Sequence, residues 1–329
     1  MTHATRAIVH RAVGAVLSVV ALGVLGLASA RAAEPGNGDL EIVPVTKNIY
    51  MIPGDGGNVV VQVGVDGIVL ANSGAADGTD RLLAAIRKIS PLPIRYIINT
   101  DGDPDSVGGN SAIAAAGQSL YNPPLGPGAS VMAFSTVLAR VAQTPGYPDS
   151  GWPTEAFLSP QYSLIINGEP IVVFHQPAAH SDGDIFVLFR NSDVVDAGNV
   201  MDMSRFPMID LAHGGSIQGE IAALDRLLEL AIPPAPLVYD YSDNATDVIP
   251  AHGRICEQWE VVDYRDMVVI ITDTIADMMK RHMTLDQIEA ADPTKAYEAR
   301  YGSTTGPWTT NMFVAAVYQS LKAADSKKK

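Results

Sequence analysis

The stretch Asn-Thr-Asp-Gly-Asp-Pro-Asp-Ser-Val-Gly-Gly-Asn at residues 99–110 is the most informative part of the chain. It follows a short apolar run at residues 94–98, in which only Arg95 is charged and polar and apolar residues do not alternate cleanly. Such a run predicts a strand that is buried on both faces, as in the centre of a sheet. The stretch then places three alternate carboxylates in a loop and ends in Gly-Gly-Asn, which we expect to open a helix.

The three carboxylates belong to Asp101, Asp103 and Asp105. Alternate residues of an extended segment point the same way, so these side chains can converge. Converged carboxylates repel one another unless a cation is present or some of them are protonated. An EF-hand loop is excluded because Ser106 and Ala112 stand where that loop needs Gly and Glu. The residues alone leave two interpretations open, a site for a hard metal ion and a solvated acidic turn.

The chain around this stretch predicts short strands and one helix. The β-rich runs are separated by Gly, Asp and Lys, which is typical of antiparallel hairpins, and they lie at residues 41–45, 48–52, 59–63 and 67–72. A helix is predicted over residues 79–89, whose apolar residues fall on one face. Residues 119–161 hold seven Pro and four Gly, so we interpret them as an insertion or flap with a short helix at about 131–142.

The second half of the chain repeats the change from strands to helices. Strands are predicted at residues 163–166, 171–174, 185–189 and 247–250. Helices are predicted at residues 216–231, 257–282 and 309–321, and Thr284 with Gln287 forms a capping box between the last two. This order predicts an α/β protein with two β-α halves whose sheets pack face to face.

The stretch at 99–110 resembles the metallo-β-lactamase superfamily signature N-T-H-x-H-x-D-H-x-G-G-N, with the framework kept and the histidines missing. Four further segments occur in the family's order. Residues 68–74 resemble its apolar strand ending in D-T-G, residues 180–184 its H-T-x-G-D segment, residues 197–199 its T-G-D segment and residues 250–253 its P-G-H-G segment. The resemblance covers about residues 41–255. It implies a four-layer αββα sandwich over residues 33–255, with residues 256–329 as a C-terminal helical extension packed on the same domain.

The resemblance also implies where two zinc ions would bind. The three histidines of the first zinc fall on Asp101, Asp103 and His180, and the ligands of the second fall on Asp105, Ser106 and His252. A bridging Asp falls on Asn199, so only Asp105, His180 and His252 keep the family's ligand type. Zinc prefers nitrogen and sulfur donors, and losing even an outer partner costs about 10–100-fold in affinity or activity. An ordinary di-zinc hydrolase is therefore not expected.

Three functional hypotheses remain. In the first, Asp101, Asp103, Asp105, His180 and His252 hold manganese, iron(II) or weakly bound zinc, and a metal-activated water hydrolyses a small ester or amide. In the second, the pocket binds no metal, and the protein is a non-catalytic module that binds a small molecule or partner. In the third, catalysis needs no metal, and Asp105 or His180 is the general base.

Several other residues have expected roles. Ser106, Asn199 and His213 are expected to line the pocket, with His213 in a loop near its rim. His175 is expected to pack or face the surface, and Asp184 to make structural hydrogen bonds.

The beginning of the chain predicts export from a bacterial cell. Arg6 and Arg11 precede an uncharged run at residues 12–30, and Ala30-Arg31-Ala32 forms a cleavage site before Ala33, as in a secretory signal peptide. Removal of residues 1–32 takes away three Arg and no acid, which moves the formal charge from −14 to −17. We therefore expect a periplasmic or secreted protein without stable membrane insertion. Its acidity argues against nucleic acid as a partner.

Overall fold

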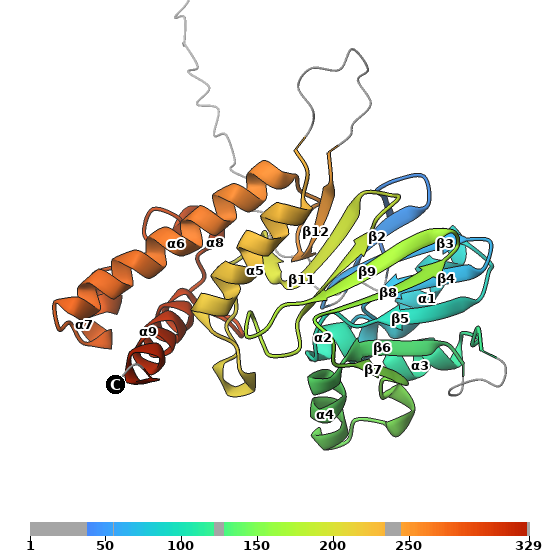
Figure 1. Ribbon diagram of the computed structural model, residues 1–329, viewed down its shortest axis with the longest axis horizontal. Helices are drawn as coiled ribbons and strands as arrows, with labels where there is room; N and C mark the ends of the chain where they lie inside the picture. Colours follow the sequence, from blue (N-terminus) through green and yellow to red (C-terminus); the bar gives the residue numbers. More distant parts are fainter. Residues whose placement is uncertain (1–37, 55, 122–127, 234–244, 328–329) are drawn as a thin grey trace, which may run out of the picture. The chain divides into compact units, whose positions relative to one another are not determined.

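The computed structural model describes residues 38–54, 56–121, 128–233 and 245–327, and these form two sheets flanked by helices (Figure 1). The first sheet has seven strands in chain order, namely β1 (Val43–Pro44), β2 (Ile49–Gly54), β3 (Gly57–Gly64), β4 (Gly67–Ala71), β5 (Ile94–Ile98), β6 (Ser130–Phe134) and β7 (Glu155–Phe157). Strands β1 to β4 pair antiparallel, and the pairs from β4 to β7 are parallel. β5 is therefore an inner strand, as its apolar sequence predicts.

The second sheet has five strands in the order β12-β11-β10-β9-β8. They are β8 (Gln161–Ile166), β9 (Glu169–His175), β10 (Ile185–Phe189), β11 (Val194–Asp202) and β12 (Asp247–His252). Only β11 and β12 pair in parallel. The sequence pattern did not predict β11, because a carboxylate at Asp196 and the pair Gly198-Asn199 interrupt its apolar run.

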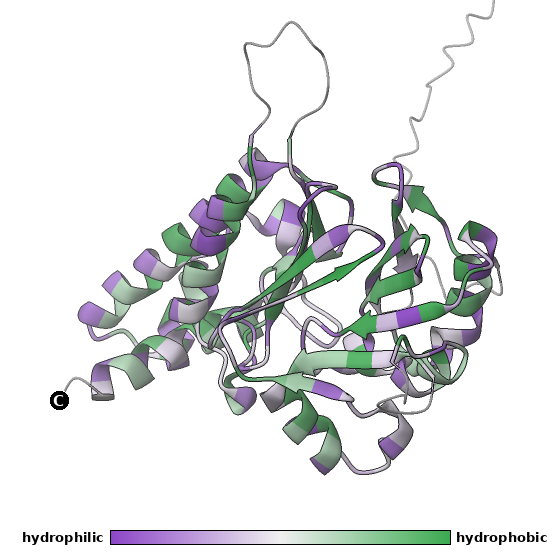
Figure 2. Ribbon diagram, turned by 45° about the vertical axis from the view of Figure 1, so that its right-hand side comes forward, coloured by the Kyte–Doolittle hydropathy of each residue, from purple (hydrophilic) through white to green (hydrophobic). Residues whose placement is uncertain are grey.

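Three apolar cores hold the layers together, one between the two sheets and one between each sheet and the helices that cover it. One core joins the inner faces of the two sheets, with Val60 and Ile98 from the first sheet and Val173 and Val187 from the second. Hydrophobic residues accordingly concentrate in the strands, whereas the helices mix both kinds along their length (Figure 2). Burial of this apolar surface is the main stabilising contribution. The facing sheets confirm the predicted αββα order of layers.

Helices cover the outer face of each sheet. α1 (Thr79–Ile89) and α3 (Asn110–Ala115) pack on the first sheet. α5 (Ile217–Leu230), α6 (Gln258–Lys280) and α9 (Thr310–Lys327) pack on the second. The remaining short helices are η1 (Ala76–Gly78), α2 (Pro104–Val107), α4 (Ser135–Gln143), η2 (Asp149–Gly151), η3 (Leu211–His213), α7 (Leu285–Ala290) and α8 (Glu298–Tyr301). Among the described residues no helix is both long enough and apolar enough to cross a membrane.

The segment expected as an insertion or flap belongs to the first sheet. The predicted helix at 131–142 is wrong in its first part, where Ser130–Phe134 is strand β6, and α4 begins only at Ser135. The reason is that the run Val131 to Phe134 is buried at every residue, because β6 lies between β5 and β7. β7 then adds the edge strand, so within its described residues the segment extends the sheet.

Candidate functional site

The candidate site lies where β4 and β5 end, and buried side-chain amides fix its loop. Asn99 Nδ2 donates to the Ser106 carbonyl and to Asn110 Oδ1, both at 3.0 Å. Asn110 Nδ2 returns a hydrogen bond to Asn99 Oδ1 at 2.9 Å. Between them, Gly109 passes so close to the Ser73 carbonyl that a Cβ atom would lie 2.3 Å from its oxygen. Asn99, Gly109 and Asn110 therefore fix the two ends of the loop against each other.

Asp101 is fully buried and has a hydrogen-bond donor at both of its oxygens. Its Oδ1 accepts from the Asp103 backbone N–H at 2.9 Å. Its Oδ2 accepts from the hydroxyls of Thr100 and Ser106 at 2.9 and 3.0 Å, and from Asn199 Nδ2 at 3.2 Å. Both Ser106 and Asn199, predicted to line the pocket, thus face Asp101. Burial, followed by the charges of Asp103 and Asp105, raises the pKa of Asp101 to about 6.

Asp103 binds two cationic side chains. His180 Nε2 lies 3.0 Å from Asp103 Oδ2, and Arg140 Nη1 lies 3.3 Å from Asp103 Oδ1. His180 Nδ1 is 2.8 Å from the Met208 carbonyl oxygen, which can only accept. Both ring nitrogens of His180 therefore face acceptors, which suits a doubly protonated imidazole.

The pKa shifts of Asp103 and His180 follow from the same contacts. Burial lowers the pKa of His180, but the hydrogen bond to Asp103 and the charges of Asp184, Asp103 and Asp101 outweigh it and raise that pKa well above its ordinary value. Burial alone would raise the pKa of Asp103. The hydrogen bond and charge of His180, together with Arg140, lower it instead. The pair is therefore an ion pair at neutral pH.

Asp105 and His252 are the two residues of the site whose polar side-chain atoms are least satisfied. His252 Nε2 lies 3.7 Å from Asp105 Oδ2, beyond hydrogen-bond distance. His252 Nε2 and Asp105 Oδ1 are both buried atoms without a hydrogen-bond partner among the described residues. Asn58 holds the end of β12 by donating to the carbonyls of Pro250 and Gly253 at 2.8 and 3.0 Å. These two retained ligand types therefore keep buried polar atoms whose hydrogen-bonding capacity is not used within the described residues.

A cleft of about 390 Å³ lies beside the ion pairs, with Thr136, Ala139, Arg140, Gln143, Thr144, Pro145, Asp182 and His213 lining it. Arg140 Nη2 is 3.3 Å from Asp182 Oδ1 in this lining. His213, predicted for the rim, lies there with its Nδ1 at 2.5 Å from Asp210 Oδ2. The Asp210 contact leaves His213 Nε2 as the ring atom available to a ligand.

Two other predicted residues have structural roles. His175 Nε2 lies 2.9 Å from the Asp182 carbonyl, and its ring stacks on Phe134 with the centroids 3.5 Å apart. Asp184 accepts hydrogen bonds from the backbone N–H and the hydroxyl of Ser181 at 2.5 and 3.3 Å. Both expectations are confirmed.

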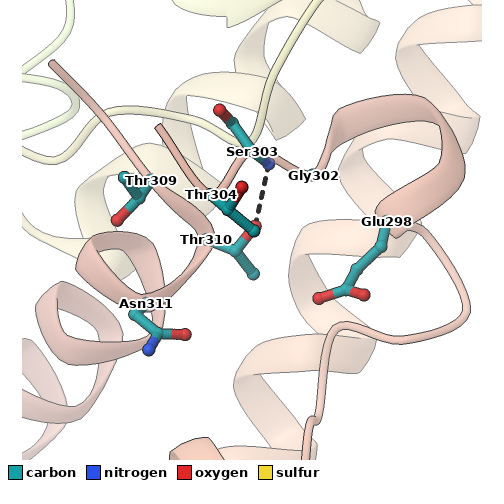
Figure 3. Close-up of a pocket in the computed structure, with 7 residues that line it drawn as sticks. All are labelled: Glu298, Gly302, Ser303, Thr304, Thr309, Thr310 and Asn311. Atoms are coloured by element: carbon teal, nitrogen blue, oxygen red, sulfur yellow. Dashed lines mark hydrogen bonds between the residues drawn. The ribbon is translucent and has the colours of Figure 1, made fainter. Parts of the chain in front are cut away.

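A second cavity, of about 370 Å³, lies in the C-terminal helices (Figure 3). Its lining residues are Glu298, Gly302, Ser303, Thr304, Thr309, Thr310 and Asn311, and the Ser303 N–H donates to Thr310 Oγ1 at 3.0 Å. Glu298 is the only titratable residue in this lining. None of the residues predicted for the site belongs to it.

The donor atoms do not fit the two-zinc centre that the family resemblance implies. One oxygen from each of Asp101, Asp103 and Asp105 lies within 4.8 Å of the others, as a cation site would require. The oxygens of Asp101 already accept from four donors, however, and those of Asp103 contact His180 and Arg140. The Nε2 atom of His180 faces a carboxylate instead of open space. A metal ion would have to displace two cationic groups and several hydrogen bonds.

Sequence reasoning missed Arg140 and Asp182. Asp182 lies inside the 180–184 segment, but nothing in the sequence of that segment indicates that it pairs with an arginine. Arg140 carried a signal that could have been used, because it is the only charged residue between Asp105 and Asp149. A single charge in a long uncharged stretch needs a partner if it is buried.

Comparisons with solved structures identify the fold. The chain is similar to the stereoselective inverting sec-alkylsulfatase Pisa1 from Pseudomonas sp., with a TM-score of 0.60 and 17% identity over 85% of this chain and 50% of that chain. It is also similar to a metallo-beta-lactamase from Pontibacter korlensis, with a TM-score of 0.54 and 16% identity over 70% of this chain and 99% of that one. The DIM-1 metallo-beta-lactamase gives a TM-score of 0.53 and 16% identity, over 70% of this chain and 97% of that chain. The chain thus spans about half the length of the alkylsulfatase. No model of a protein family and no curated protein matches the sequence.

Proposed function

The chain has the metallo-β-lactamase fold, which is a hydrolase-type fold in these relatives, and on that premise we propose that it is a binding protein for a small polar molecule. In this proposal, ion pairs between side chains replace the metal centre. The observation that carries the proposal is the Asp103–His180–Arg140 cluster, in which the atoms that would hold the first metal already bind one another. The ligand binds in the cleft beside Arg140 and His213 and reaches toward Asp105 and His252.

The chemistry of the cleft supports a polar ligand with both donors and acceptors. Arg140 and His213 offer N–H groups, the Asp182 carboxylate accepts, and Gln143 can do both. Pockets that bind small molecules combine an enclosing shape with a few such convergent polar groups. As part of the same proposal, the protein acts outside the cytoplasm after its first 32 residues are removed.

Metal content is the first test. We expect protein purified without chelator to hold well below one zinc or manganese per chain, and its melting temperature to be the same with and without EDTA. The matched variant carries Asp101→His, Asp103→His, Ser106→His and Asn199→Asp, which restore the family's ligand types. Two tightly bound zinc ions in the unmodified protein, with chelator-sensitive hydrolysis, would refute the proposal.

Ligand binding is the second test. We would follow the melting temperature with small carboxylic acids, phosphate esters and sulfate esters as probes. We expect His213→Ala and Gln143→Ala to abolish the stabilisation that a bound probe gives. Asn311→Ala, in the cavity of Figure 3, whose lining shares no residue with the cleft, serves as the control and should leave the stabilisation unchanged. Probe-induced shifts that are equal in all three variants would place the ligand elsewhere.

A second candidate function is metal-independent hydrolysis, favoured by the buried polar atoms of Asp105 and His252 that have no hydrogen-bond partner among the described residues. In such a reaction His252 Nε2 would take a proton from water, the hydroxide would attack an ester carbonyl, and the alcohol would leave with that proton. Slow ester hydrolysis that survives EDTA and disappears in His252→Gln would favour this candidate over pure binding.

A further inference from the structure

Arg140 reaches the carboxylate cluster from a different part of the first sheet. It lies on α4, between β6 and β7, and its side chain is only 11% exposed. Its guanidinium bridges Asp103 and Asp182, with both N–O distances at 3.3 Å. A cation in this position stabilises two carboxylates that would otherwise repel each other.

The loop is shaped to admit this side chain. A Cβ atom on Gly102 would lie 3.0 Å from Arg140 Cδ and 3.3 Å from Nε, so a larger residue would press on the arginine. Gly102 separates Asp101 from Asp103, and the guanidinium therefore passes directly over the acidic loop. Arg140 does not lie at the edge of the cluster but over its backbone.

The charges around the cluster show what Arg140 does. Oxygens of Asp101, Asp103 and Asp105 lie within 4.8 Å of one another, and the ion-pair contacts to them come from Arg140, His180 and His252. Arg140 adds the fixed charge of a guanidinium to that of His180 at the Asp103 carboxylate. A divalent cation bound by these carboxylates would be repelled by that charge.

We infer that Arg140 is a built-in counter-ion, which excludes divalent cations from the cluster of Asp101, Asp103 and Asp105. Removal of its charge turns this cluster into a divalent-cation site. The inference rests on the proposed function, because it supplies a reason for the metal-free state that the proposed function assumes. It also goes beyond the proposed function. A protein that binds no metal need not gain a metal site when one arginine is replaced, whereas this inference requires that gain.

The experiment is a titration of the full chain with manganese chloride, followed by calorimetry and by the electron paramagnetic resonance signal of free Mn²⁺. We expect Arg140→Met to raise Mn²⁺ affinity at least about 100-fold. This lower limit is the effect of one unit charge on another at roughly 6 Å in an effective dielectric of about 20, and Mn²⁺ carries two unit charges. Arg140→Lys keeps the charge and should give a much smaller gain. Combining Arg140→Met with Asp103→Asn should remove the gain, because the double variant lacks one ligand.

Arg265→Met is the matched control. Arg265 also bridges two carboxylates, Asp225 and Asp266, at 2.8 and 3.0 Å. Its side chain is 31% exposed, against 11% for Arg140, and neither of its carboxylates is as buried as Asp103. Its replacement should leave Mn²⁺ binding as weak as in the unmodified protein. Arg140→Gln serves as the second variant if the Met variant does not fold, as judged by circular dichroism.

The outcomes separate the two proposals. Stoichiometric Mn²⁺ in the unmodified protein would overturn both the proposed function and the role of Arg140. A folded Arg140→Met or Arg140→Gln variant that binds no more Mn²⁺ than the unmodified protein would overturn only the role of Arg140. An equal gain in Arg265→Met would also overturn it, because it would show unspecific binding to any freed pair of carboxylates.

Discussion

Asp196→Asn should stabilise the protein at pH 8 and weaken the dependence of its stability on pH. Asp196 lies in β11, is 2% exposed, and uses only Oδ1 in a hydrogen bond, accepting from the Gly198 N–H at 3.0 Å. Its Oδ2 is buried without a hydrogen-bond partner among the described residues. Burial, less the effect of the Gly198 hydrogen bond, raises the pKa of Asp196 to about 7. The unfolded chain should titrate near its ordinary value of about 3.9.

The sign follows from proton binding. Between pH 4 and pH 7 the folded protein keeps a proton on Asp196 that the unfolded chain has lost, so the free energy of unfolding falls as the pH rises through this window. Above pH 7 the buried charge costs at most about 4 kcal/mol, from roughly three pKa units at 1.36 kcal/mol each. An Asn side chain avoids this charge but leaves a buried N–H pair without an acceptor, at about 1–3 kcal/mol. The net expectation is a gain of about 1–3 kcal/mol at pH 8 and no gain, or a loss, at pH 4.

Urea unfolding of the two proteins from pH 4 to pH 8.5 measures this difference. In thermal unfolding, the gain at pH 8 corresponds to a rise in melting temperature of roughly 2 °C per kcal/mol for a domain of this size. Asp149→Asn, at an exposed position in η2, is the control and should leave both curves unchanged. A variant whose free energy of unfolding changes with pH as steeply as that of the parent would refute the reasoning, because Asp196 would then not hold the proton.

Two further predictions concern the framework and the processing of the chain. Asn99→Ala should lower the free energy of unfolding by about 1–3 kcal/mol, because it leaves Asn110 Oδ1 buried without the donor that Asn99 supplies. The Ser106 carbonyl keeps the hydrogen bonds that it accepts from Ser73, and a loss below about 1 kcal/mol in urea unfolding would contradict the prediction. The exported protein should begin at Ala33 on N-terminal sequencing, because the residues before it follow the signal-peptide pattern. A start at Met1, or recovery only with membranes, would count against export.

The framework of the site was predictable from sequence because it consists of local signals. An apolar run, then Asn99, then Gly108-Gly109-Asn110 specify a strand, a loop and a helix start within twelve residues. The close approach of Gly109 to Ser73 is the physical reason for a glycine there. Because these contacts lie near the ends of neighbouring strands, the order of motifs was sufficient to place them.

The partners of the carboxylates were not predictable in the same way. The contact between Arg140 and Asp103 joins residues far apart in the sequence, and it depends on how α4 follows β6. The Pro-rich composition of residues 119–161 indicated a flap and obscured β6, whose residues are buried because strands pair on both sides. Likewise, Met208 contributes only its carbonyl to His180, and a backbone group leaves no trace in the sequence.

The position of α4 also determines how the site responds to motion at the end of the sheet. α4 lies between β6 and the edge strand β7, and it packs through a small apolar core of Val107, Ala133, Val137 and Val141. Segments with little buried apolar surface open at a lower free energy than the whole protein. Each such opening would carry Arg140 away from Asp103 for a short time and expose the acidic loop to water. Amide hydrogen exchange in α4 should therefore be faster than in β5, and it would report how often the carboxylates are without Arg140.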